Sequence, residues 1–118
     1  MADWIFNRSG QATLIYDEDC IRSRQGKVVG WINGDSVYTM HGQHVGWFDG
    51  GVLSDRSNKV IGFLADCTGH LPSRPTMGGI PGMPGFSGRP GQPGLAGRPG
   101  KPGRSGWSTA DLATYFIS

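Results

Sequence analysis

The sequence has neither a long hydrophobic segment nor a set of clustered cysteines. No run in its 118 residues approaches the ~18 consecutive apolar side chains that a bilayer-spanning helix needs, so we expect no membrane insertion. Cys20 and Cys67 are too few for a disulfide scaffold and form no CxxC pair. The opening residues, MADWIFNR, have no basic segment followed by an apolar one, which predicts no signal peptide and a location in the cytoplasm or in a particle assembled there.

Motifs for catalysis and for metal or phosphate binding are absent as well. The sequence contains no P-loop, no G-x-S-x-G elbow, no HExxH pair and no Cys/His cluster with metal-ligand spacing. His41 and His44 are three residues apart, but in a turn followed by a strand this spacing does not aim both rings at one metal. We therefore expect a non-enzymatic protein without cofactor, metal or catalytic residues.

Acidic residues are missing from one long stretch. Residues 1–73 carry eight acids against six Lys or Arg, whereas residues 74–106 carry five Lys or Arg and no acid. A basic segment suits a polyanion or an acidic face of the same chain, although charged runs most often serve only solubility. The tryptophans and the basic residues lie in different segments, which argues against nucleic acid as the partner.

Glycine, in contrast, is abundant and falls at a strict period of three. Nine G-X-Y triplets run without interruption, six of them with proline at Y, and this pattern is typical of a collagen-like segment. Three polyproline-II chains wound together leave room only for a hydrogen at their axis, so the period predicts backbone packed against these positions. The ten glycines in phase are Gly79, Gly82, Gly85, Gly88, Gly91, Gly94, Gly97, Gly100, Gly103 and Gly106.

A second repeat, with a spacing of sixteen residues, precedes the glycine tract. Four units cover residues 4–67, and equivalent positions agree in type across them, which is strong evidence of repetition. Each unit contains a short strand, a polar turn with Gly or Asn at its end, and a β-branched and aromatic strand. The four units begin at Trp4, Cys20, Ser36 and Val52.

Each unit is typical of a β-hairpin. The turn residues, such as Asn7–Gly10, predict a type I turn closed by a left-handed residue, which Gly and Asn adopt most easily. An isolated hairpin is only marginally stable, and closing four into a ring removes exposed sheet edges. We therefore predict a mainly β fold, a four-hairpin flower or barrel in which Trp4–Phe6 pairs with residues 59–64; an open meander is the alternative.

Apolar residues occupy both faces of the predicted sheet. Trp31, Trp47 and Phe63, with Ile15 in the first unit, are expected on one face, as an aromatic binding platform or, more simply, as a packed centre. The glycines before these aromatic residues would let another backbone or ring approach closely. The other face is also apolar, so a neighbouring subunit or the C-terminal part of the chain is expected to cover it. Its residues are Tyr16, Ile32, Phe48 and Leu64.

Charged turn residues are predicted to gather at the two ends of such a ring. Arg8, Arg24 and Arg56 lie in the hairpin turns and are candidates for binding an anion. The turns that link the hairpins carry acids and are candidates for a cation such as calcium, although they lack the D-x-D-x-D-G spacing of a calcium loop. Solvent-exposed turns are polar in any case, because Asp, Asn and Gly suit their backbone conformations.

The C-terminal residues 107–118 predict a short helix. Ser108 and Asp111 imitate a capping box, and Leu112, Tyr115 and Phe116 share one helical face. Two turns of helix are not stable alone, so this segment must dock, either on copies of itself or back onto the repeats. Trp107 is the expected anchor.

These motifs resemble those of the bacterial four-fold β-flower domain family. The resemblance is carried by the G-(K/Q)-x-V-G-(W/F) units, the linker with Pro72 and Pro75, and the terminal Trp-Ser with its aromatic segment. It implies a flower fold and no catalytic residues. The first unit departs from the pattern, with Leu14-Ile15 in place of Gly-aromatic. The glycine tract is similar to the collagen-like stalks of bacterial and phage proteins, which implies trimers.

The expected organisation is a four-hairpin domain (1–67), a linker (68–78), a collagen-like tract (79–106) and a capping helix (107–118). The leading hypothesis is a structural or binding protein in which three chains assemble through the tract and present the β head in several copies to another protein. The alternative is a monomeric or differently assembled ligand- or protein-binding module whose glycine-rich segment packs on the head. Its contact residues would then be Ile80, Met83, Phe86 and Leu95.

Overall fold

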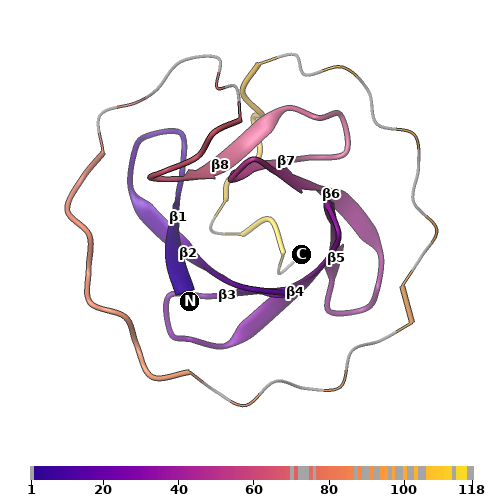
Figure 1. Cartoon of the computed structure of the whole chain (residues 1–118), viewed down its shortest axis with the longest axis horizontal. Helices are drawn as coiled ribbons and strands as arrows, with labels where there is room; N and C mark the ends of the chain where they lie inside the picture. Colours follow the sequence, from indigo (N-terminus) through magenta and orange to yellow (C-terminus); the bar gives the residue numbers. More distant parts are fainter. Residues whose placement is uncertain are drawn as a thin grey trace.

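Eight antiparallel strands follow one another around a closed barrel (Figure 1). The computed structural model describes residues 2–69, 71, 75, 77–86, 88, 91, 94, 95, 97, 100, 103, 106–112 and 114–116. The strands are β1 (Ala2–Phe6), β2 (Ala12–Asp17), β3 (Cys20–Arg22), β4 (Val28–Asn33), β5 (Ser36–Thr39), β6 (His44–Asp49), β7 (Val52–Ser54) and β8 (Val60–Leu64).

Pairing of the first strand with the last closes the barrel. Ile5 of β1 pairs with Leu64 of β8, and Phe6 pairs with Phe63, while every other strand pairs with its neighbours in sequence. The predicted mainly β fold and its closure through Trp4–Phe6 are confirmed, and the open meander is wrong. Closure leaves no strand edge of the barrel open for pairing with another chain.

One side chain in each unit fixes the hairpin turn. The oxygen of the fourth residue of the unit accepts hydrogen bonds from the backbone N–H groups two and four residues later. The residue three positions after this acceptor has a φ between +57° and +86°, as the predicted turn requires. The acceptors are Asn7, Ser23, Thr39 and Asp55, and the left-handed residues are Gly10, Gly26, Gly42 and Asn58.

The barrel therefore has two different ends. Residues 7–10, 23–26, 39–42 and 55–58 form its hairpin end, and the turns 17–20, 33–36 and 49–52 form its link end. The link-end turns have two residues each, with positive φ at Glu18, at Gly34 and at both Gly50 and Gly51. Two-residue turns with positive φ match the right-handed twist of the adjoining strands. Glycine is favoured in them because it adopts a positive φ most easily.

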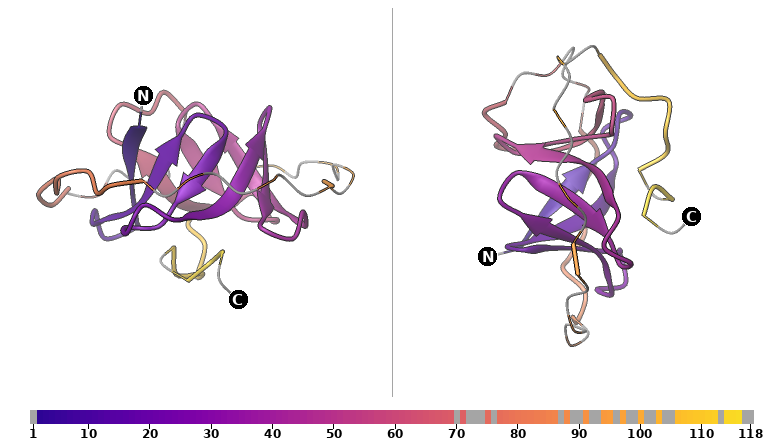
Figure 2. Two further views of the ribbon diagram at one scale, coloured as in Figure 1. Left: turned by 90° about the horizontal axis from the view of Figure 1, so that it is seen from below. Right: turned by 90° about the vertical axis from the view of Figure 1, so that its right-hand side faces the viewer.

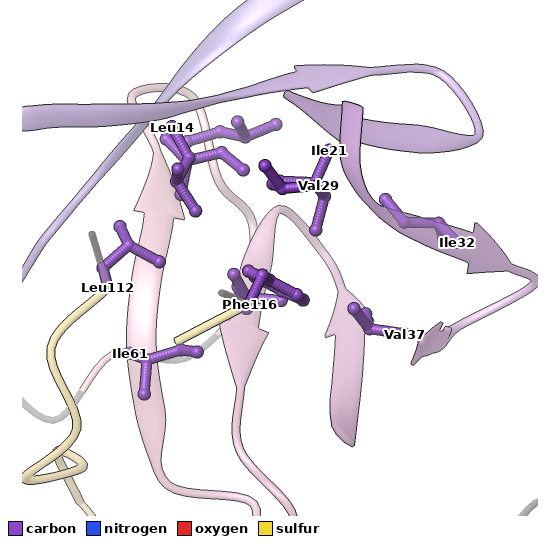
Figure 3. Packing of buried hydrophobic residues seen from close by; sticks show 11 residues of the cluster. Leu14, Ile21, Val29, Ile32, Val37, Ile61, Leu112 and Phe116 are labelled. Atoms are coloured by element: carbon purple, nitrogen blue, oxygen red, sulfur yellow. The ribbon is translucent and has the colours of Figure 1, made fainter. Parts of the chain in front are cut away.

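Side chains from all four units and from the C-terminal tail fill the lumen (Figure 3). Leu112 and Phe116 of the tail are buried among the strand residues. A fully buried side chain of this size contributes about 1.5–3 kcal/mol, so the tail is part of the core and not an appendage. The fully buried residue that each unit contributes is Ile5, Ile21, Val37 or Leu53.

Two glycines of the repeat make room for this tail. A Cβ at Gly30 would lie 3.0 Å from Cδ1 of Phe116, and a Cβ at Gly62 would lie 3.0 Å from Cδ2 of Leu112. The expected close approach to these glycines is confirmed. The first unit has Leu14 at the same position, and this side chain is buried in the core. The departure of the first unit from the repeat thus fills space that the glycines leave for the tail elsewhere.

Strand alternation turns the aromatic residues that follow these glycines outward. Trp31 and Phe63 belong to clusters outside the lumen, whereas Ile32 and Leu64, one residue later, belong to the lumen core. Trp31, Trp47 and Phe63 are therefore not the centre of the domain. The period of two separates the faces of a strand, but the position of the tail decides which face is inside.

The C-terminal tail docks across the hairpin end of the barrel (Figure 2). Val60 donates to the carbonyl of Gly106 at 2.8 Å and its own carbonyl accepts from Ser108 at 2.7 Å. Trp107 lies against Phe63, with ring centroids 6.2 Å apart, and the hydroxyl of Tyr115 donates to the carbonyl of Val45 at 2.5 Å. Of the two predicted docking sites, the repeats of the same chain are the one observed.

The helix predicted for residues 107–118 is not confirmed. The described residues 107–112 and 114–116 form turns, with bonds from Thr114 to Asp111 and from Tyr115 to Leu112. The hydroxyl of Ser108 accepts from the amide of Ala110 and donates to the carboxylate of Asp55 at 2.7 Å. Contacts with the barrel at several points override the helical periodicity of this short segment.

The described residues of the glycine tract lie around the outside of the barrel (Figures 1 and 2). Residues 77–86 run beside the hairpins, and the described residues from 88 to 103 continue around the ring before 106–112 turn inward. Gly78 donates to the carbonyl of Gly10 at 2.8 Å, which joins the start of the tract to the first hairpin turn.

We predict that Gly30→Ala destabilises the protein by about 1–3 kcal/mol, because the new methyl group overlaps the Phe116 ring and the Tyr38 carbonyl. Urea unfolding followed by tryptophan fluorescence measures the change. A Phe116→Leu background should reduce the cost of Gly30→Ala, since leucine leaves space beside residue 30. Equal costs in the two backgrounds would show that Phe116 does not press on this glycine.

Candidate functional site

The outer surface of the barrel carries two buried aromatic clusters. One contains Trp4, Phe6 and Phe63, with Leu71 and Trp107 packed against them. The other contains Trp31 and Tyr38. Trp4, Phe6, Phe63, Trp31 and Tyr38 lie outside the lumen yet are at most 6% exposed, and Leu71 and Trp107 are half-buried. Segments outside the barrel must therefore cover part of this surface.

The glycine tract supplies some of this cover. The indole Nε1 of Trp4 donates to the carbonyl of Pro81 at 2.9 Å. The side chain of Leu95 packs against the cluster of Trp31 and Tyr38. A Cβ on Gly26 would collide with the carbonyl of Gly85, so the tract lies directly on the second hairpin turn. The outer surface thus holds the tract through the indole hydrogen bond of Trp4, the apolar contact of Leu95 and the close packing of the Gly85 carbonyl on Gly26.

Arg22 is a buried charge at the contact between the barrel and the tract. Its Nε donates to Oδ2 of Asp17 at 2.8 Å, and its Nη1 donates to the carbonyl of Gly26 at 2.7 Å. Its guanidinium carbon lies 4.4 Å from the centroid of the Phe86 ring. A guanidinium over an aromatic face contributes about 0.5–2 kcal/mol, with the larger value where water is excluded. Arg22 therefore joins a link-end turn, a hairpin turn and the tract.

The periodic glycines have open space, among the described residues, where a side chain would extend. A Cβ added at any of the positions Gly79 to Gly106 in the period would have no atom of another segment within 4 Å. The steric crowding that the period predicts is therefore not produced by the described residues of the same chain. The tract contacts the barrel through residues between its glycines and through backbone carbonyls, and the glycine positions remain open.

The aromatic residues predicted as a binding platform are covered. Trp31 and Trp47 are 3% exposed and Phe63 is fully buried, so they do not form an open surface. The indole Nε1 of Trp31 has no acceptor in the described part of the chain, in contrast to Trp4. His44 is 6% exposed and packs edge-on against Tyr38 and Trp47, whereas His41 is exposed.

The three predicted anion-binding arginines lie on separate hairpin turns. Arg8, Arg24 and Arg56 are exposed and belong to the first, second and fourth units. Arg24 lines a cavity together with Gly78–Pro81, and Arg8 lines another beside Ser108. The five cationic residues of the basic stretch lie outside the described residues: Arg74, Arg89, Arg98, Lys101 and Arg104.

A different cavity lies at the link end of the barrel. Its volume is about 370 Å³, and it is lined by strand residues of all four units and by residues of the link-end turns. The rings of Tyr16 and Phe48 meet there, with centroids 4.8 Å apart and planes inclined by 46°. The same position of the repeat supplies the four strand residues, namely Tyr16, Ile32, Phe48 and Leu64.

The roles of Arg22, Trp4 and Glu18 were not predicted from the sequence. Arg22 occupies a strand position where the other units have Phe6, Tyr38 or Ser54, and this substitution was an available signal. The contact of Trp4 with Pro81 had no local signal, because the two residues are 77 positions apart. Glu18 could have been noticed as the one non-glycine among three equivalent turn positions.

Two further searches concern the described residues only. Within them, no group of three or more His, Cys, Asp or Glu side chains is placed to hold a metal ion. Nor does the same part of the structure contain a helix that is long and apolar enough to span a membrane. Neither Cys20 nor Cys67 forms a disulfide; the first is buried and the second half-buried.

Comparison with known proteins identifies the family. The model of the family described as 4-fold beta flower protein matches residues 3–116, which is nearly the whole chain. The protein therefore belongs to the four-fold β-flower family. Neither the curated proteins nor the solved structures contain a significant match.

The buried thiol of Cys20 and the half-buried phenol of Tyr115 are predicted to make the protein less stable at high pH. Burial and the nearby Asp17 raise the pKa of Cys20 from 9.0 to about 11, and burial and Asp55 raise the pKa of Tyr115 from 10.0 to about 12. The unfolded chain releases these protons at lower pH than the folded chain does. The stability linked to them is therefore fully present below pH 9 and is lost as the pH rises through 9–12.

Urea unfolding at pH 8 and pH 10.5 measures this loss. Cys20→Ala should lose less stability between the two pH values than the wild type does, whereas Cys67→Ala serves as the matched control. A parallel measurement with Ellman's reagent at pH 8 should label Cys67 in the folded protein and Cys20 only after denaturation. Rapid labelling of both thiols in the folded state would contradict the burial of Cys20.

Proposed function

We propose that this protein is a non-enzymatic protein-binding module that recognises a strand of polyproline-II type. The outer surface of the β flower holds a glycine- and proline-rich strand, and in this chain the strand is its own tract. The observation that carries the proposal is the hydrogen bond from the indole of Trp4 to the carbonyl of Pro81. Aromatic grooves with such polar contacts are a recurrent means of binding proline-rich segments, whose extended conformation is preformed.

The length of the tract supports binding within one chain. The tract meets the first hairpin turn at Gly78, the second at Gly85 and the fourth unit at Gly106. A polyproline-II strand rises about 3.1 Å per residue, so the path from Gly78 to Gly106 would reach about 87 Å. The molecule measures 36 × 36 × 24 Å, and three quarters of a circle 36 Å across is about 85 Å. The tract is thus long enough to reach from the first hairpin turn to the fourth unit around the outside of the barrel.

The tract contacts the barrel at separate points with exposed residues between them. This arrangement favours replacement of the tract by a strand from another protein. Ile80, Met83 and Phe86 remain 40–66% exposed although they belong to the bound segment. Ile80, Pro81 and Met83 border a cavity of about 280 Å³ beside Trp4 and Phe6. A strand held at a few anchors and open between them can be displaced by another strand of the same chemistry, in the manner of a tethered ligand.

A chain with the tract replaced tests this function. Residues 79–105 are changed to nine Gly-Ser-Ser triplets, which keeps the length and leaves the C-terminal tail attached. We expect this variant to fold and to lose about 1–3 kcal/mol of stability, since the contacts of Phe86 and Leu95 are lost. A synthetic peptide of residues 78–106 should then bind in trans and change the tryptophan fluorescence with saturation.

The peptide with Phe86 and Leu95 changed to serine is the matched control and should bind more weakly. A Trp4→Phe change in the replaced chain should also weaken binding, because phenylalanine cannot donate to the carbonyl of Pro81. Absence of any peptide binding by a folded variant, or equal binding of both peptides, would refute recognition of the strand.

A second function, assembly through the tract, is favoured by the open glycines. No described atom lies within 4 Å of a Cβ built on any of the periodic glycines, and a hydrogen at every third residue has a steric purpose only where other backbone comes close. The backbone that approaches them would then belong to further copies, three chains in a collagen-like arrangement. The barrels would be presented in several copies, which raises avidity without new contacts.

Gly88→Ala separates the two functions. No atom lies within 4 Å of a Cβ at this position, so a strand bound to its own barrel should tolerate the change within about 0.5 kcal/mol. In a triple helix the same methyl group would occupy the crowded axis and lower the melting temperature of the assembly. Light scattering and circular dichroism measure mass and melting together. A monomer insensitive to Gly88→Ala excludes the trimer, and a trimer that dissociates on the change excludes binding within one chain.

A further inference from the structure

The lumen of the barrel is closed at one end and open at the other. The C-terminal tail lies across the hairpin end (Figure 2), and its residues Leu112 and Phe116 pack into the lumen core (Figure 3). The cavity of about 370 Å³ lies at the link end. We call it the mouth pocket. The mouths of small β-barrels are a preferred place for ligands, because side chains from many strands converge there.

Two aromatic rings form part of the floor of the mouth pocket. Tyr16 comes from β2 and Phe48 from β6, which lie on opposite sides of the closed barrel with three strands between them in either direction. Both rings are half-buried, whereas Ile32 and Leu64 beside them are only 8% exposed. The floor thus offers aromatic surface to the pocket within an apolar surround.

The rim of the mouth pocket is acidic. Glu18 and Asp19 line it. Asp35 and Asp49 belong to the other link-end turns, next to the lining residues Gly34 and Gly50. None of the turns 17–20, 33–36 and 49–52 contains Lys or Arg. The exposed Lys and Arg residues of the barrel lie instead in its hairpin turns and next to them: Arg8, Arg24, Lys27, Arg56 and Lys59. Among the described turns of the barrel, the link end thus carries acids and no Lys or Arg, which suits a cationic ligand better than an anionic one.

Glu18 occupies a backbone conformation that the repeat otherwise gives to glycine. Its φ is +57°, and the equivalent residues of the next two units are Gly34 and Gly50 with φ of +66° and +61°. A non-glycine residue in this region is strained relative to glycine. The first unit thus has a carboxylate at the rim at a position where glycine would be more stable.

We propose that the mouth pocket binds an organic cation, specifically a methylated ammonium group. Such a group is large, weakly hydrated and without strong hydrogen-bond donors, so it suits an aromatic floor better than a metal ion does. Calcium requires six to eight oxygen ligands, which this apolar floor does not provide. The cation would contact the faces of Tyr16 and Phe48 while the carboxylates of Glu18 and Asp19 compensate its charge.

This site is separate from the strand-binding surface. The tract contacts Trp4, Arg22 and Gly26 on the outside of the barrel, whereas the residues of the mouth pocket face the lumen or its rim. The two proposals can fail independently, because variants at the mouth leave the tract contacts in place.

Choline and its neutral carbon isostere, 3,3-dimethylbutan-1-ol, are the probes. They have nearly the same shape, so a difference in affinity reports the charge. We expect choline to bind the full chain with at least about tenfold higher affinity than the alcohol. In NMR titrations the methyl signal of choline should shift upfield, and the ring signals of Tyr16 and Phe48 should shift with the same dissociation constant. Raising the salt concentration should weaken the binding of choline, since part of the attraction comes from exposed carboxylates.

Three variants examine the residues named. Glu18→Gln keeps the shape of the side chain and should lower the affinity for choline by about threefold to tenfold, whereas Asp111→Asn, near the opposite end, is the charge control and should leave it unchanged. Phe48→Leu removes one ring and keeps an apolar side chain, and it should reduce both the affinity and the upfield shift. Glu18→Gly should raise the melting temperature while it weakens binding, because glycine relieves the positive φ.

Several outcomes would overturn the proposal. Equal binding of choline and the alcohol would show an apolar pocket that does not select charge. Competition by calcium at a concentration equal to that of choline would show a metal site. The absence of ring shifts at 50 mM choline, with the protein folded, would show that no ammonium site is present at the mouth.

Discussion

The structure depends on the closure of a ring that is too small to be stable as separate hairpins. Each sixteen-residue unit forms two strands and two tight turns, and its apolar residues point to both faces of the sheet. Pairing of β1 with β8 converts four such units into one barrel with a lumen and an outer surface. Both surfaces are apolar, so closure alone leaves two regions that need cover. The remaining chain provides much of that cover.

The C-terminal tail and the glycine tract cover these regions by different means. The tail inserts Leu112 and Phe116 into the lumen, and glycines at equivalent positions of the repeat leave the space for them. The tract lies on the outer surface through isolated contacts, among them the indole of Trp4 and the guanidinium of Arg22. The tail therefore belongs to the folded core, whereas the tract has the character of a ligand attached to the barrel. This difference underlies our proposal that the outer surface recognises a strand.

The asymmetry of the four units has a physical function at both ends of the barrel. Leu14 replaces glycine in the first unit and fills lumen space, so strict four-fold symmetry would leave either a cavity or a clash with the tail. Glu18 replaces glycine at the link end of the same unit and adds a carboxylate beside the mouth pocket. Arg22, in the next unit, replaces an aromatic or small residue and connects the barrel to the tract. The departures from the repeat thus lie where the four-fold barrel contacts the tail, borders the mouth pocket and contacts the tract.

The sequence by itself determined the local features, because turns and strand periodicity depend on neighbouring residues. The sixteen-residue phase, the left-handed residues of the hairpin turns and the family resemblance all followed from it. The pairing of Trp4–Phe6 with residues 59–64 is not local, but it followed from the repeat, because a closed ring of four units brings the first and last strands together. Only the tertiary structure decided that Trp31, Trp47 and Phe63 face outward, that the tail forms turns across the hairpin end of the barrel and that the Cβ positions of the periodic glycines are open. Strand alternation specifies the two faces of a sheet, and the glycine period specifies a spacing. Neither specifies which segment packs against them. That choice depends on contacts between residues up to 77 positions apart, which local propensity does not contain.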